Sequence, residues 1–297
     1  MAAEKQSFDA VIVGAGPAGV TCAVWMARLG FKPALVDAAA GVGGLCRFNP
    51  YVDDWNPSLP GATGEQLADN LALSLGEAGV TPWLSRTVTE ARVAPVGVSV
   101  VLAHGPSTVM GRFLVLATGV RPRSLPGLNG PLPAVLVGPG RHILAQDFRG
   151  LRVAVLGGGD NAFGAALYAM ERGAARVRVY ARNVRAQRQL VAQVPAQQVV
   201  RGDYVVDPHR RRVDAEAFDL IMVFYGWEPC IGFARALGLR CCARGFIETD
   251  PATAQTSTRG VYAIGEVTRR QHPCVVTAMA DGITAAKAMQ ARIEAGR

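Results

Sequence analysis

The sequence predicts an α/β fold made of two similar units. Near the N-terminus a β-branched run, a glycine-rich turn, a helical stretch and a second β-branched run follow one another, and the same order returns 143 residues later, counted from Gly14 to Gly157. Half of the 297 residues are hydrophobic and only 18% are charged, so the chain has enough apolar residues for two domain cores. Strands that alternate with helices are typical of parallel sheets covered by helices.

The first unit has the order of a dinucleotide-binding element. Its strand, helix and second strand are expected at residues 8–13, 20–29 and 33–36. The turn reads Gly14-x-Gly16-x-x-Gly19, in which the first glycine makes the tight turn, the second lets the backbone approach a pyrophosphate and the third lets the helix pack closely. Phosphates bind at the helix N-terminus, where unpaired N–H groups favour negative charge. Asp37 follows the second strand, and we expect it to accept hydrogen bonds from a ribose.

The second unit repeats this order but ends differently. Its strand, helix and second strand are expected at residues 152–156, 163–172 and 176–180, with a turn that contains Gly157, Gly159 and Ala162. Where an acid would bind a ribose 2′-hydroxyl, the chain has Arg182 and Arg185. Arginines at this place favour a 2′-phosphate, and therefore NADP over NAD. The alternative is that the two arginines only line a solvated surface.

Two further segments carry candidate site residues at their ends. Residues 113–119 read as a buried strand that ends in Thr118 and Gly119, and residues 260–266 as another that ends in Gly265 and Glu266, before a helix over 275–293. In open α/β sheets ligands bind outside the carboxyl ends of the strands. We therefore expect Glu266 to contact a cofactor.

Charge and cysteine content narrow the possible functions. The formal net charge is +8, and only three of the 31 basic residues are lysines. Arginine suits phosphates or an acidic protein partner, although a coding bias also explains its excess. No nucleic-acid motif accompanies the run Arg210 to Arg212, so no nucleic-acid partner is expected. The six cysteines form no C-x-x-C pair, so neither a metal site nor a disulfide framework is expected, and the adjacent Cys241 and Cys242 are expected to be thiols.

No apolar run of about 18 residues is present, and the N-terminus lacks the layout of a signal peptide. We therefore expect a cytoplasmic protein without a membrane partner.

These residues resemble the two-domain flavoprotein disulfide reductases, and most closely the low-molecular-weight thioredoxin reductase group, which includes the thioredoxin-reductase-type ferredoxin/flavodoxin–NADP reductases. The matching motifs cover nearly the whole chain: Gly14-x-Gly16-x-x-Gly19, Gly43-Gly44, Asp54-Trp55, Ala117-Thr118-Gly119, Gly157-x-Gly159-x-x-Ala162, Gly226-x-x-Pro229 and Gly265-Glu266.

The resemblance implies two Rossmann-like dinucleotide-binding domains, with the NAD(P) domain (120–228) inserted into the FAD domain (1–119 and 229–297). It implies a homodimer, and it implies FAD contacts from Gly14, Gly16, Gly19, Asp37, Gly44, Thr118, Gly119, Gly265 and Glu266. On the NADP side it implies Gly157, Gly159, Ala162, Arg182 and Arg185. Only 38 residues separate the strand 176–180 from the run that begins at Asp219, so we expect a trimmed NADP domain.

The chain departs from the group in its redox cysteines. The paired cysteines of a thioredoxin reductase precede the second glycine turn, where this chain reads Gly140-Arg141-His142-Ile143. Without two thiols, electrons cannot pass from the flavin to a disulfide through the protein. His142 is either a loop histidine or a proton donor to reduced flavin. Cys274 lies either near the flavin or at a helix cap, and Cys46 follows Gly43-Gly44 without its usual partner cysteine.

The sequence therefore predicts an FAD-dependent NAD(P)H oxidoreductase that passes electrons from NADPH through flavin to an external acceptor, such as ferredoxin, flavodoxin or a quinone-like molecule. It is not expected to be a dithiol disulfide reductase. An acidic electron-transfer protein is the expected partner. The alternatives are a flavin-binding module with a degenerate NADP site and a flavoenzyme that acts on a small-molecule substrate.

Overall fold

The computed structural model describes residues 7–49, 52–53, 55–94, 96–103, 108–128, 130–268 and 272–296, and Asp54 of the Asp54-Trp55 motif lies outside them. Contacts between residues divide the chain into two units. The first comprises Met1–Val120 and Pro229–Arg297, and the second Arg121–Glu228. The chain passes from the first unit to the second at β6 (Val120–Pro122) and returns at β15 (Trp227–Pro229), and these two strands pair with each other.

The first unit is built on a mixed sheet. Its strands are β1 (Ser7–Val13), β2 (Pro33–Val36), β3 (Val88–Val93), β4 (Val98–Leu102), β5 (Thr108–Leu116) and β16 (Val261–Ala263). The order is β2-β1-β5-β4-β3, and β16 also pairs with β5. β1 runs parallel to β2 and β5, and β16 runs parallel to β5, whereas β3 and β4 form an antiparallel extension. Four carboxyl ends therefore lie at one edge of the sheet.

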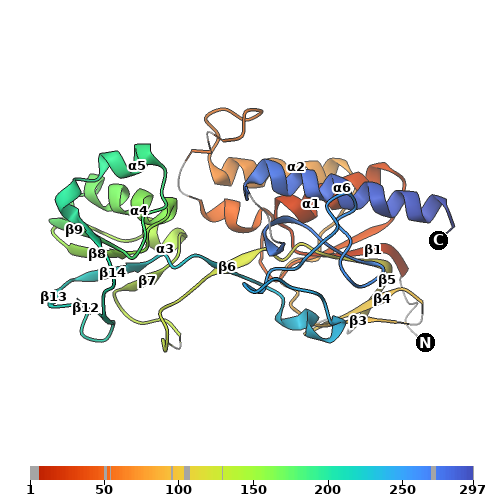
Figure 1. Ribbon diagram of the computed structural model, residues 1–297. Helices are drawn as coiled ribbons and strands as arrows, with labels where there is room; N and C mark the ends of the chain where they lie inside the picture. Colours follow the sequence, from red (N-terminus) through yellow and green to blue (C-terminus); the bar gives the residue numbers. More distant parts are fainter. Residues whose placement is uncertain are drawn as a thin grey trace. The chain divides into compact units, whose positions relative to one another are not determined.

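Three helices cover one face of this sheet: α1 (Pro17–Arg28), α2 (Gly64–Glu77) and α6 (Val275–Glu294) (Figure 1). α1 and α6 pack closely, and glycine at position 282 of α6 permits this contact. A Cβ at Gly282 would lie only 2.5 Å from the carbonyl oxygen of Ala18 in α1. The other face forms a second buried cluster, in which residues of the strands, β3 and β4 included, pack with the 3₁₀ helix η3 (Gly232–Leu237). Two further 3₁₀ helices, η1 (Gly44–Phe48) and η4 (Gly265–Val267), follow β2 and β16 in the chain.

The second unit contains a five-stranded parallel sheet. Its strands are β7 (Val135–Val137), β8 (Arg152–Leu156), β9 (Arg176–Ala181), β10 (Val199–Arg201) and β14 (Leu220–Val223), in the order β10-β9-β8-β14-β7. One face packs against α3 (Arg141–Leu144), α4 (Asp160–Glu171) and α5 (Arg188–Gln193). The other face packs in part against the short meander β11 (Val206–Asp207), β12 (Arg212–Val213) and β13 (Glu216–Ala217). A 3₁₀ helix, η2 (Ala196–Gln198), precedes β10.

The predicted α/β class is confirmed, and the differences lie at the ends of elements. α1 begins at Pro17 instead of Val20, because proline at the first helical position has the helical φ and lacks the N–H that would be unpaired there. β5 ends at Leu116 and β16 at Ala263, so Thr118 and Glu266 follow strands instead of ending them. Among the described residues, no helix is long and apolar enough to span a lipid bilayer.

Candidate functional site

The residues predicted for the first unit gather at the carboxyl edge of its parallel strands. Val13, the last residue of β1, pairs with Val36 of β2 and Leu116 of β5, and Leu116 also pairs with Ala263 of β16. The four strands therefore end at the same level of the sheet. The residues that follow them lie along this edge, among them Gly14, Asp37, Thr118 and Gly265. Backbone hydrogen bonds continue across this edge, from Gly14 N to Val36 O and from Ala117 N to Val13 O, both at 2.8 Å.

The three glycines of the first turn meet three different steric demands. Gly14 has φ +111°, and a Cβ there would lie 2.3 Å from the carbonyl oxygen of Ala117. A Cβ at Gly19 would lie 1.9 Å from the carbonyl oxygen of Gly14. Gly16 is different, because no atom of the described residues lies within 4 Å of the Cβ position and its extended backbone suits any residue. The protein needs glycine at positions 14 and 19 for its own packing, whereas Gly16 borders open space.

This edge fits the phosphate and ribityl portions of FAD. Gly16 is the N-cap of α1, and the start of this helix has neither a capping side chain nor an acidic residue, so its N–H groups can receive a phosphate. The hydroxyl of Thr118 is buried without a hydrogen-bond partner, and a buried polar atom of this kind is satisfied by a ligand or water. Gly44 lies next to Gly16 at this edge, because a Cβ at position 44 would lie 3.1 Å from Cα of Gly16.

Asp37 has a structural role in addition to its predicted one. Its Oδ2 accepts a hydrogen bond from Ala15 N at 2.5 Å, and its Oδ1 accepts one from Ala39 N at 2.7 Å. The carboxylate thus ties the glycine turn to the end of β2. Each carboxylate oxygen can accept more than one hydrogen bond, so the contact with a ribose hydroxyl stays a prediction.

Glu266 lies beside Cys46 in the first unit. The pKa of the Cys46 thiol is raised to about 12, first by burial and then by the negative charges of Asp53 and Glu266. Burial also raises the pKa of Glu266. The chain contains no motif that links positions 46 and 266, and sequence analysis did not predict this pair.

We expect Glu266→Gln to stabilise the protein without FAD at high pH. Because the pKa of Glu266 is higher in the folded state than its ordinary 4.5, the folded state binds this proton more tightly. The free energy of unfolding therefore falls as pH rises from the unfolded value through the folded one, and glutamine removes this fall. Denaturant titration should show the variant to be more stable than wild type at about pH 8 and nearly equal at about pH 3, which lies below the ordinary pKa of 4.5. Glu77→Gln, which changes an exposed carboxyl in the same unit, is the control and should show no such pH dependence.

The two candidate catalytic residues have local partners. Cys274 is the exposed N-cap of α6, where its sulfur accepts a hydrogen bond from Thr277 N at 3.5 Å. It thus has a capping role, and its proximity to the flavin stays a prediction. His142 lies in α3 of the second unit, with Nε2 3.1 Å from the carbonyl oxygen of Gly138. Asp281 of α6, which sequence analysis missed, accepts a hydrogen bond from Gly265 N at 3.0 Å.

The second unit holds a cavity of about 1140 Å³ at the carboxyl edge of its sheet. Gly157, Arg182 and Arg185 line it, so the structure brings together the predicted glycine turn and the two arginines. The same wall includes Tyr204 and Tyr225, neither of which the sequence singled out. Arg185 is held close to the turn, because its backbone N–H donates to Gly158 O at 2.6 Å.

The second glycine turn repeats the steric pattern of the first. A Cβ at Gly157 would lie 2.4 Å from the carbonyl oxygen of Phe224, whereas none of the protein's atoms lies within 4 Å of a Cβ at Gly159, the N-cap of α4. Ala162 is buried in the first turn of this helix. Unlike α1, α4 begins with an acid, Asp160, whose carboxylate accepts a hydrogen bond from Gln187 N at 2.8 Å. The donors and the open space fit a dinucleotide at this edge too.

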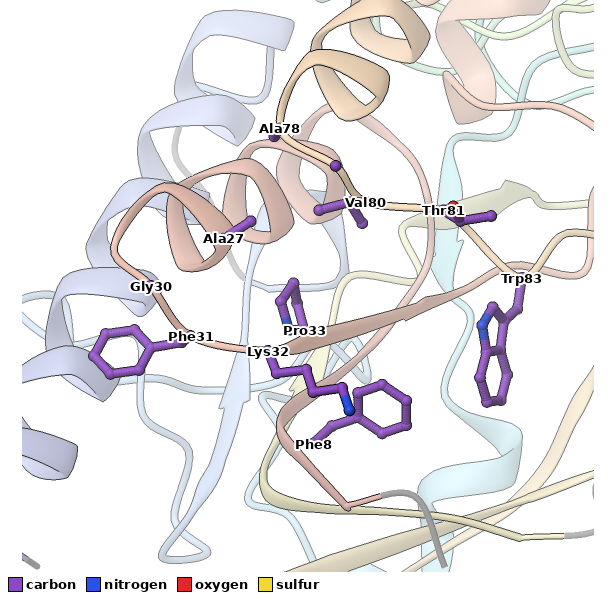
Figure 2. A pocket seen from close by; sticks show the side chains of 11 residues that line it. Phe8, Ala27, Gly30, Phe31, Lys32, Pro33, Ala78, Val80, Thr81 and Trp83 are labelled. Carbon is purple, nitrogen blue, oxygen red and sulfur yellow. The ribbon is translucent and has the colours of Figure 1, made fainter. Parts of the chain in front are cut away.

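A separate cavity of about 450 Å³ lies at the opposite edge of the first sheet (Figure 2). It is formed where β2 begins and where α1 and α2 end, and its walls include Phe8, Phe31 and Trp83. Lys32, the one charged residue among the described residues that line it, lies over the ring of Phe8, with Nζ 5.4 Å from the ring centroid. None of the predicted site residues lines this cavity, so it is distinct from the dinucleotide edge.

Comparison with known proteins identifies the family. The model of the pyridine nucleotide-disulphide oxidoreductases matches residues 8–282. The chain belongs to this family. It is an FAD-dependent NAD(P)H oxidoreductase, and its cofactors are FAD and NADPH. The predicted architecture, two Rossmann-like domains for FAD and NAD(P), is thereby confirmed as well.

Several members of this family are similar over most of their length. The ferredoxin–NADP reductase of Limosilactobacillus fermentum is 29% identical over 88% of this chain and 86% of its own. The thioredoxin reductase of Peptoclostridium litorale is 26% identical over 97% of each chain. In fold, the chain matches the crystal structure of Lactococcus lactis thioredoxin reductase with a TM-score of 0.83 and 24% identity, over 97% of this chain and 99% of that one.

Proposed function

We propose that this flavoprotein carries electrons from NADPH to an external acceptor, either a ferredoxin- or flavodoxin-like protein or a quinone-like molecule. The observation that carries the proposal is the pair of glycine turns, one at the carboxyl edge of each sheet, each with open space at its N-cap glycine. A relative named ferredoxin–NADP reductase, 29% identical over most of both chains, supports this type of acceptor.

In this proposal the chain supplies binding and orientation. Gly16 and the start of α1 hold the pyrophosphate of FAD, Asp37 accepts from its ribose, and Thr118 donates its unpaired hydroxyl to the cofactor. Bound FAD would supply the redox chemistry, namely uptake of a hydride from NADPH and delivery of its electrons to the acceptor. Arg182 and Arg185 line the cavity of the second unit and bind the 2′-phosphate of NADPH.

The cysteines support an acceptor other than a disulfide. All six lie in the described residues, and no disulfide joins any two of them. No two are spaced as C-x-x-C. Cys46, which follows Gly43-Gly44, is held in its thiol form by burial and by two carboxylates, and the thiol is a poor nucleophile in exchange. Cys274 is occupied as a helix cap.

The uneven distribution of charge supports an acidic protein as the acceptor. The second unit has fifteen arginines, no lysine and nine carboxylates, so most of the net charge of +8 lies in its 108 residues. Opposite charge speeds the encounter of electron-transfer partners at low salt. A homodimer, which the family resemblance implies, and a cytoplasmic location, which the sequence favours, complete the proposal.

Anaerobic mixing with NADPH tests this function. The flavin absorbance should bleach rapidly, and the reduced protein should then pass electrons to ferricyanide and to an acidic ferredoxin. A flavin that stays oxidised with NADPH would support the alternative of a flavin-binding module. Bleaching that is reversed by no protein or quinone acceptor would support an enzyme that acts on a small-molecule substrate.

NADPH should bind better than NADH, and the preference should depend on two arginines. A hydrogen bond to a charged group contributes roughly 1.5–3 kcal/mol, or about 10- to 150-fold in affinity. Replacing Arg182 and Arg185 with alanine should lower the affinity for NADPH by about this factor and leave the affinity for NADH nearly unchanged. Both affinities are measured from the rates of flavin reduction. Arg149→Ala, which removes an exposed guanidinium that does not line the cavity, is the control. Equal losses for both cofactors would show that the two arginines are structural.

A further inference from the structure

Two tyrosines from different strands meet in the cavity of the second unit. Tyr204 follows β10 and Tyr225 follows β14, and both are half-buried in the wall that also contains Arg182. Their hydroxyls are hydrogen-bonded to each other. The pair therefore joins two loops that follow the carboxyl ends of strands, where nucleotides bind in sheets of this type.

Strand register places Tyr204 close to Arg182. β10 pairs in parallel with β9, with Arg201 opposite Ala181, so Arg182 and the loop that carries Tyr204 leave the sheet at the same level. The ring of Tyr204 also packs against the ring of Tyr180 in β9. Two hydroxyls that share one hydrogen bond carry two protons, so one proton stays available to a ligand in the cavity. Burial raises the pKa of each phenol above its usual range, so both hydroxyls keep their protons.

The surroundings of Tyr204 favour an anion. The positive charge of Arg182 acts on both hydroxyls and lowers the pKa of each. Arg123 and Arg185 also line the cavity, and Asp203 is the one carboxylate among the described lining residues, so positive charge is in excess. A hydroxyl donor beside a guanidinium provides two donors for the oxygens of one phosphate group.

We propose that Tyr204 determines the preference for NADPH: its hydroxyl donates a hydrogen bond to the 2′-phosphate alongside Arg182, and Tyr225 positions it for this contact. The proposal rests on the proposed function, in which the second unit binds NADPH. Tyr204 is then a binding residue and Tyr225 a positioning residue that acts through it.

Tyr180 provides a matched control inside the same cluster. Its ring is buried and packs against the ring of Tyr204, with centroids 5.6 Å apart. Its hydroxyl is hydrogen-bonded to Oε2 of Glu216 at 3.1 Å, and Tyr180 does not line the cavity. Tyr180→Phe thus removes a hydroxyl next to Tyr204 without removing a donor from the cavity.

Calorimetric titration of the FAD-containing protein with adenosine 2′,5′-bisphosphate and with adenosine 5′-monophosphate tests the proposal, because the two probes differ only in the 2′-phosphate. Wild type should prefer the bisphosphate. Tyr204→Phe should reduce this preference at least about tenfold and leave the affinity for the monophosphate unchanged, because only the hydrogen bond to the charged group is lost. Tyr225→Phe should reduce the preference less, and Tyr180→Phe should not change it.

The outcomes separate this proposal from the proposed function. If Tyr204→Phe keeps the wild-type preference while Arg182→Ala loses it, the guanidinium binds the 2′-phosphate without help from Tyr204. The role proposed for Tyr204 is then wrong, although the proposed use of NADPH is unaffected. If Tyr204→Phe weakens both probes equally, Tyr204 is structural and the proposal is also wrong. If wild type shows no preference for the bisphosphate, the NADPH assignment itself fails and the tyrosine proposal fails with it.

Discussion

Gly16→Val should give a folded protein that retains no FAD, whereas the wild type should purify yellow. At position 16 the backbone is extended, with φ −75° and ψ −179°, and no atom of the described residues lies within 4 Å of the Cβ position. The Cβ of valine therefore meets no obstacle in the part of the chain that the structure describes. Its methyl groups would occupy the space at the start of α1 that the pyrophosphate needs. Absorbance of the flavin after gel filtration, together with the melting temperature of the protein without FAD, measures both effects.

Substitution of Gly19 in the same turn should instead destabilise the fold. A Cβ at Gly19 would lie 1.9 Å from the carbonyl oxygen of Gly14, so Gly19→Val forces α1 away from the sheet and should destabilise the fold by at least about 3 kcal/mol. Gly76→Val places the same side chain on an exposed site of α2 with nothing within 4 Å and should retain FAD. A Gly16→Val protein that still purifies with FAD would contradict the assignment of the first turn.

NADPH-dependent reduction of thioredoxin or glutathione disulfide should be negligible, while ferricyanide is reduced. Exchange with a disulfide requires a thiolate as nucleophile and a second thiol that resolves the mixed disulfide. A pKa of about 12 leaves roughly one Cys46 in 100,000 as thiolate at neutral pH. Cys274 is exposed, but its sulfur caps α6.

A double variant, Cys46→Ser with Cys274→Ser, tests the same prediction from the other side. Serine is a good N-cap residue, so position 274 should continue to cap α6, and ferricyanide reduction should stay close to wild type. The test measures the rates of NADPH oxidation with ferricyanide and with each disulfide, for the wild type and for the double variant. Rapid disulfide reduction by the wild type that disappears in the double variant would reveal a split dithiol centre formed by these two residues.

The local parts of both candidate sites could be predicted from the sequence alone. A short β-branched run, a glycine turn and a helix are determined by residues that are close in the chain, because the positive φ at Gly14 and Gly157 favours glycine at both positions. The position directly after the second strand also distinguishes the two units, with Asp37 in the first and Arg182 in the second. The α/β class, the two units and the cofactor family follow from these signals.

Only the tertiary structure decided which distant residues share an edge. The registers of β1, β2, β5 and β16 bring Thr118 and Gly265 level with Gly14, and the turn over residues 43–48 places Gly44 against Gly16. The charge of Glu266 acts on the Cys46 thiol, and the hydroxyls of Tyr204 and Tyr225 are hydrogen-bonded, although no sequence motif links the residues of either pair. Strand order and register depend on the packing of whole sheets, so contacts between residues far apart in the chain have no local signature. For the same reason, burial and nearby charge, which keep Cys46 a thiol, could be read only from the fold.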